Sequence, residues 1–84
     1  MVKKTVTVQR EEGLEARTIA MLVQKASQFS SRVHIEVGNK SINAKSIMGM
    51  MSLRVGNGDE VAVVTDGVDE MAAADEIELY LQAQ

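Results

Sequence analysis

The stretch RVHIEV-GN-KSINA, residues 32–44, decides the fold. Apolar and polar residues alternate over 32–37, which is typical of a half-buried strand. Gly38-Asn39 supplies a two-residue turn with glycine first, which suits a type II′ hairpin. Residues 40–44 are therefore predicted to return as the partner strand, and a turn this tight requires antiparallel pairing.

The segments before the hairpin add a strand and a helix. Residues 2–8, VKKTVTV, are rich in Val and Thr and predict a strand. A polar loop follows over 9–14 and ends with Gly13 and Leu14. Between Glu15 and Phe29 the apolar residues have helical spacing, so a helix of about three turns is expected there.

The segments after the hairpin predict two more helices around a fourth strand. Residues 46–53 are predicted to form a short helix with Ser46 as N-cap, which Gly49 weakens by roughly 1 kcal/mol relative to alanine. Residues 60–65, EVAVVT, predict a strand. Asp69 is expected to cap a last helix with an inner face of Ala73, Ala74, Ile77, Tyr80 and Leu81.

The resulting order is βαββαβα within a single domain, residues 1–84. A hairpin interleaved with helices favours an α+β open-faced β-sandwich, in which a four-stranded antiparallel sheet carries three helices on one face. A ferredoxin-like fold is the alternative arrangement of the same elements.

Composition narrows the class of protein. Hydrophobic residues make up 45% and charged residues 25% of the chain, which is globular rather than disordered. There is no cysteine, so disulfides are excluded, and one histidine without cysteine disfavours a structural zinc site. The apolar runs are too short to span a membrane, and the first residues lack the apolar core of a secretory signal. We expect a cytoplasmic protein without membrane contact.

The net charge of −3 hides an asymmetry. Residues 1–54 carry nine basic and four acidic side chains, net +5, whereas residues 55–84 carry eight acidic side chains and no basic one, net −8. Either a solvated acidic helix balances a basic body, or the basic part is a working face. The low pI of 5.0 and the scarcity of aromatic residues disfavour direct binding of nucleic acid.

The sequence contains few residues or motifs that indicate an enzyme active site. It has no nucleophilic cysteine and no phosphate-binding loop of the G-x-x-x-x-G-K-[ST] type. The single histidine, His34, stands between two inward-facing strand residues and is predicted to point to solvent. We expect no enzymatic activity, no cofactor and no metal site.

Two predicted helix starts are natural positions for negative charge, because unpaired backbone N–H groups and the helix dipole converge there. Glu15 places a carboxylate at the first, close to Arg17. The alternative is an ordinary glutamate that stabilises its helix by about 0.3–1 kcal/mol.

Ser46 stands at the second helix start. A phosphate there would add about −1.5 to −2 charges beside Lys45, and Ile47, Met48 and Met51 would offer adaptable apolar contacts to a protein partner. Alternatively Ser46 only caps the helix and the methionines only pack.

Two motifs resemble segments of the HPr family, the histidine-containing phosphocarriers of the bacterial sugar phosphotransferase system. Gly13-Leu14-x-Ala16-Arg17, followed by an apolar helix, is similar to the family's active-site segment. Residues 42–53, INAKSIMGMMSL, resemble the regulatory-serine segment of Gram-positive members, and most of all that of the catabolite-repression HPr-like (Crh) type. Length and element order match over essentially the whole chain.

The resemblance implies a regulator rather than a phosphocarrier. The family's phosphocarrier histidine would stand where this chain has Glu15, and Crh-type proteins usually have glutamine there. Thr18 replaces a family proline, which should perturb the fold little because proline is favoured early in a helix but not required. Glu15 is either a fixed mimic of phosphohistidine or only a helix-start residue.

The resemblance also implies partners. HPr kinase/phosphorylase would phosphorylate Ser46 with ATP, and the phosphoprotein would bind CcpA, a LacI-type transcription regulator, in carbon catabolite repression. The expected partner-binding residues are Arg17, Ala20, Met21, Lys45, Ile47, Met48 and Met51. The alternatives are a phosphocarrier component that uses Glu15 and a passive protein-interaction domain. Strand exchange that yields a homodimer is compatible with a thinly stabilised sheet domain.

Overall fold

The computed structural model, which describes residues 1–82, contains the predicted hairpin at one edge of its sheet. Strand β2 (Arg32–Val37) and strand β3 (Lys40–Asn43) pair antiparallel, with Val37 opposite Lys40 across a two-residue turn. Gly38 has φ 61°, the positive value that the first residue of this turn requires. The pairing ends at Asn43, one residue earlier than predicted.

Two further strands extend the sheet on the other side of β2. Strand β4 (Glu60–Asp66) pairs antiparallel with β2, and strand β1 (Val2–Thr7) pairs antiparallel with β4. The strand order is β1-β4-β2-β3, so the first and fourth strands of the chain are neighbours. Strand β4 lies between β1 and β2, and its burial alternates along the strand, as expected where helices cover only one face of an antiparallel sheet.

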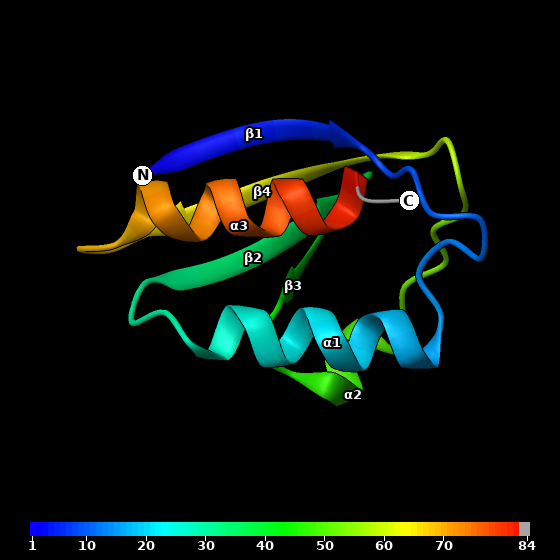
Figure 1. Ribbon diagram of the computed structural model, residues 1–84, viewed down its shortest axis with the longest axis horizontal. Helices are drawn as coiled ribbons and strands as arrows, with labels where there is room; N and C mark the ends of the chain where they lie inside the picture. Colours follow the sequence, from blue (N-terminus) through cyan, green and yellow to red (C-terminus); the bar gives the residue numbers. More distant parts are fainter. Residues whose placement is uncertain (83–84) are drawn as a thin grey trace.

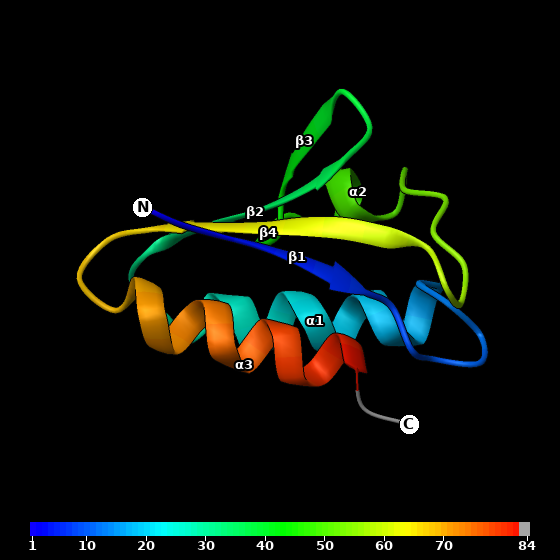
Figure 2. The same ribbon diagram turned by 90° about the horizontal axis from the view of Figure 1, so that it is seen from above.

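Two long helices cover one face of this sheet. Helix α1 (Ala16–Ser27) and helix α3 (Glu70–Gln82) lie side by side on the same side of β1, β4 and β2 (Figures 1 and 2). Helix α2 (Ile47–Met50) is a single turn that packs against α1 and β3, shorter than the predicted 46–53. The α+β open-faced sandwich is confirmed.

The core lies between the sheet and the two long helices. The largest fully buried side chains include Ile19, Leu22, Ile35, Met50 and Ile77. Most of the predicted inner face of α3 is buried. Tyr80 is the exception, because it is half-buried and its hydroxyl donates to the Thr18 carbonyl at 3.3 Å.

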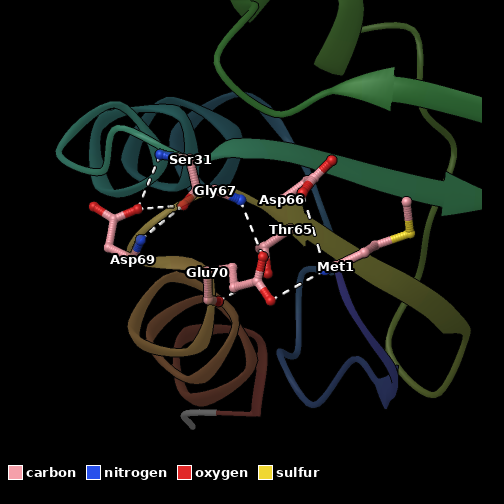
Figure 3. Close-up of polar contacts among 7 residues, drawn as sticks. All are labelled: Met1, Ser31, Thr65, Asp66, Gly67, Asp69 and Glu70. Atoms are coloured by element: carbon pink, nitrogen blue, oxygen red, sulfur yellow. Dashed lines mark hydrogen bonds and ion pairs between the residues drawn. The ribbon is translucent and has the colours of Figure 1, made fainter.

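Asp69 occupies the predicted position before α3, where its backbone carbonyl accepts the Ala73 N–H at 2.9 Å, but its side chain has another role (Figure 3). Its carboxylate does not cap α3. It accepts from the Ser31 hydroxyl and from the backbone N–H groups of Ser31 (2.9 Å) and Ser30 (3.0 Å), in the loop after α1. These N–H groups lie beyond the end of α1 and need acceptors. The Ser31 hydroxyl, followed by the Ser30 N–H, lowers the pKa of Asp69 to about 2.

The neighbouring carboxylate closes the same junction. Glu70 accepts from the Gly67 N–H at 3.0 Å and from the Met1 ammonium at 3.1 Å (Figure 3), and these two contacts lower its pKa. Gly67 has φ 153°, and an added Cβ would lie 2.5 Å from the Ser31 hydroxyl oxygen. The start of α3 is thereby tied to β1, to β4 and to the loop before β2.

Candidate functional site

The start of α1 is set by the two residues before Glu15. The Leu14 N–H donates to the Val55 carbonyl at 2.9 Å. Gly13 has φ 67°, and an added Cβ would lie 2.5 Å from that same carbonyl oxygen. Only glycine fits this close approach, which anchors the loop before α1 to the segment before β4.

Glu15 occupies the N-cap position in an extended conformation, φ −119° and ψ −177°. Its side chain is exposed and makes no capping hydrogen bond. The backbone N–H groups of Ala16, Arg17 and Thr18 have no acceptor within residues 1–82. The carboxylate is therefore at the positive end of the helix, as predicted, but acts there only through its charge.

Arg17 and Thr18 differ in their contacts. Arg17 is exposed and has neither a hydrogen bond nor an ion pair in the described part of the chain, so its guanidinium is available to a partner. Thr18 is buried, and its hydroxyl donates to Glu12 at 3.2 Å. At the position of the family's proline, threonine thus adds a link to the preceding loop.

Ser46 is the N-cap of α2, as predicted. Its hydroxyl oxygen accepts from the Gly49 N–H at 3.1 Å. A Cβ on Gly49 would lie 3.1 Å from Ile42 Cγ2 and 3.3 Å from the Ser46 hydroxyl oxygen, which accounts for a glycine inside this helix. The sequence showed the cost in helix propensity but not this close approach.

Lys45 is engaged within the chain. Its ammonium donates to the Phe29 carbonyl at 2.6 Å, just beyond the end of α1, and its backbone N–H donates to Asn43 Oδ1 at 2.9 Å. No sequence pattern indicated this contact, because a lysine and a carbonyl 16 residues apart leave no spacing signal. The contact fixes the chain before Ser46 against α1.

The methionines of α2 divide between core and surface. Met50 is fully buried, whereas Met48 is 87% exposed, Ile47 54% and Met51 46%. Met21 on α1 is 43% exposed and Ala20 is exposed beside it in sequence. We call these five exposed residues the α1–α2 apolar surface, because the two helices pack against each other.

The two helix starts are separate positions. The contact between Lys45 and Phe29 holds the residue before Ser46 near the C-terminal end of α1, whereas Glu15 stands at the other end. Figure 1 shows α2 below the middle of α1.

Among residues 1–82, no three His, Asp or Glu side chains gather closely enough to hold a metal ion. None of the helices described there combines the length and the apolar character needed to cross a bilayer.

Known proteins match this chain over nearly its full length. The model of the family described as "PTS HPr component phosphorylation site" matches residues 2–83. The HPr-like protein Crh of Bacillus subtilis is 44% identical over 84 residues, which cover 100% of this chain and 99% of that protein.

Solved structures resemble this chain in both fold and sequence. The crystal structure of the phosphocarrier protein HPr from Bacillus anthracis superimposes with a TM-score of 0.93 at 42% identity and covers 96% of each chain. A crystal structure of Bacillus subtilis Crh, described as a swapped-domain, intertwined dimer, has a TM-score of 0.79 at 45% identity and covers 98% of this chain and 94% of the other. With this agreement in fold, length and sequence, the chain belongs to the HPr family.

Proposed function

We propose that this protein is a non-enzymatic regulator of carbon catabolite repression, of the Crh type. HPr kinase/phosphorylase phosphorylates Ser46, and the phosphoprotein binds the transcription regulator CcpA without touching DNA itself. Glu15, in place of the phosphocarrier histidine, excludes phosphorelay through an imidazole. This role places the protein in the cytoplasm.

The observation that carries the proposal is the position of Ser46 directly beside exposed apolar side chains. Its hydroxyl lies at the start of α2, and the next two residues, Ile47 and Met48, are 54% and 87% exposed. Burial of such side chains by a partner contributes about 25 cal/mol per Å² of apolar surface. A charge switch and a contact surface thus adjoin each other.

The geometry around Ser46 accepts a phosphate without unfolding α2. The N–H groups of Ile47 and Met48 have no acceptor within residues 1–82, and the Gly49 N–H already points to the Ser46 hydroxyl oxygen. Phosphoryl oxygens can accept from such groups at a helix start. Phosphorylation therefore changes the surface mainly through its charge of about −1.5 to −2.

The first experiment is incubation with ATP and HPr kinase/phosphorylase, followed by intact-mass measurement. We expect one added phosphoryl group on the native protein and none on Ser46→Ala. Ser52→Ala is the matched control, because Ser52 is an exposed serine just after α2 whose hydroxyl donates to the Gly49 carbonyl at 2.6 Å. An unmodified native protein would contradict the proposal.

The second experiment is titration of CcpA with the phosphorylated and unphosphorylated forms by calorimetry. Binding should require the phosphoryl group. The same titration with phosphorylated Glu15→Gln tests whether Glu15 imitates phosphohistidine and so biases partner choice through like-charge repulsion. Equal affinities of the two phosphoproteins would reduce Glu15 to a helix-start residue.

A phosphocarrier role is the second candidate, and the close superposition on the Bacillus anthracis phosphocarrier favours it. It requires an acyl phosphate on Glu15, whose carboxylate is exposed at the start of α1. Incubation with phosphoenolpyruvate and enzyme I, without the kinase, separates the two functions. A phosphoryl group that appears on the native protein but not on Glu15→Gln would establish the carrier function.

Two further features belong to the proposal. The swapped-domain dimer described for Bacillus subtilis Crh supports a homodimer of this chain formed by strand exchange, which light scattering after size-exclusion chromatography would detect. A protein that is neither phosphorylated at Ser46 nor labelled by enzyme I would be a passive interaction domain that uses Arg17 and the α1–α2 apolar surface.

A further inference from the structure

A polar depression lies at the β2–β3 hairpin and extends to Lys45, the residue before Ser46. It has a volume of about 300 Å³ and is lined by Arg32, His34, Asn43 and Lys45, from β2, β3 and the residues just after β3. Val33 and Ile35 of β2 are buried under the helices, so the alternating residues Arg32 and His34 face the opposite side. Figure 2 shows α1 and α3 confined to the other side of β2.

Hairpin register brings this lining together. His34 is directly opposite Asn43 in the β2–β3 ladder, and Arg32 is two residues before His34 on the same face. Lys45 follows, held by its backbone bond to the Asn43 side-chain oxygen. With that oxygen accepting from Lys45, the NH2 group of Asn43 remains a donor among the lining residues.

The lining consists of hydrogen-bond donors without a carboxylate. Arg32 is exposed and has no hydrogen bond or ion pair in the described part of the chain. The Lys45 ammonium uses one donor on the Phe29 carbonyl, and an ammonium has three. This set can surround an anion and leaves it no repelling partner at the wall.

Two acidic residues of the neighbouring strand positions lie close to other cations. Glu36, two residues after His34, pairs with Lys3 at 3.2 Å. Asp66, opposite Arg32 in the β2–β4 ladder, lies 3.9 Å from the Met1 ammonium. Neither carboxylate forms an ion pair with Arg32, so the guanidinium is available to an anion.

We propose that this depression on β2 and β3 binds a small phosphomonoester. Arginine matches the paired oxygens of a phosphate with two parallel N–H donors, and His34, Asn43 and Lys45 supply further donors around it. About 300 Å³ lies at the lower end of small-ligand sites and fits a phosphate with a short organic group. The site lies apart from the α1–α2 apolar surface, and through Lys45 it adjoins Ser46.

The test is titration of the ¹⁵N-labelled full chain with glycerol 3-phosphate, followed by NMR. Saturable shifts should concentrate on the amides of Arg32, His34 and Asn43, and glycerol should produce none. Arg32→Gln should weaken binding about tenfold, the loss expected when a charged hydrogen-bond pair is removed. Arg54→Gln is the matched control, since Arg54 is an exposed, unpaired arginine outside the depression within the described chain.

Saturable shifts centred on β2 and β3 and a selective loss in Arg32→Gln would establish the site. Shifts that grow linearly and spread over all basic residues, or equal weakening by the two variants, would overturn it. The wild-type shift map decides the matter even if the Arg32 variant folds poorly.

Discussion

Replacing Gly13 with alanine tests whether a single backbone contact positions the start of α1. Gly13 has φ 67°, and a left-handed conformation costs a residue with a Cβ about 1–2 kcal/mol. The new Cβ would also lie 2.5 Å from the Val55 carbonyl oxygen and 2.8 Å from Gly56 Cα. These are backbone atoms, so the segment before β4 must move.

That movement has a second cost. The Val55 carbonyl accepts the Leu14 N–H at 2.9 Å, and Leu14 is only 6% exposed. Displacing the carbonyl leaves a buried donor unsatisfied, at about 1–3 kcal/mol. The two effects together predict a loss of about 2–5 kcal/mol for Gly13→Ala, a large part of the roughly 4–13 kcal/mol expected for a chain of this length.

The matched control is Gly38→Ala. Gly38 has a similar φ of 61°, but an added Cβ there would meet nothing within 4 Å. It should lose only the conformational share of about 1–2 kcal/mol. Urea unfolding followed by circular dichroism measures both. Equal transition midpoints for the two variants would refute the reasoning, because the clash with Val55 would then contribute nothing.

Three further predictions follow from particular contacts. Ser46→Ala should lose about 0.5–2 kcal/mol of unfolding free energy in urea, since it removes the cap of α2. Met48→Ser should change that free energy by less than about 0.5 kcal/mol, because the side chain is 87% exposed, yet should weaken binding of the phosphoprotein to CcpA in the calorimetric titration. Asp69 has a pKa of about 2 in the folded protein against 3.8 ordinarily, so it stabilises the fold above about pH 4 and this contribution is lost as the pH falls toward 2. The gap in urea midpoint between wild type and Asp69→Asn should therefore be wide at pH 7 and close by about pH 2, and a gap independent of pH would contradict it.

The sequence was sufficient for the elements whose signals are local. Alternation over 32–37 and the Gly38-Asn39 turn predicted the hairpin, and the order of elements predicted the open-faced sandwich. Ser46 was predicted as a cap because capping depends on residue type and on three positions of spacing. These features need only neighbours in the chain.

What the sequence did not reveal depends on contacts between distant segments. Asp69 was expected to cap α3, but its carboxylate serves the loop after α1, 38 residues away. The contact between Lys45 and Phe29 and the depression beside His34 likewise arise only when the sheet brings separate segments together. Local propensity cannot rank such partners, because several acceptors and donors compete for each group.

The proposed switch depends on the small number of interactions that stabilise α2. One helical turn is marginal by itself, and this one is kept in place by the buried Met50, the Ser46 cap and the close approach of Gly49 to Ile42. A phosphate on Ser46 leaves the buried contact untouched and meets unpaired N–H groups at the helix start. The partner would then encounter the same apolar side chains with a new double negative charge beside them. Regulation of this kind requires no change of fold, which suits a small domain whose stability is limited.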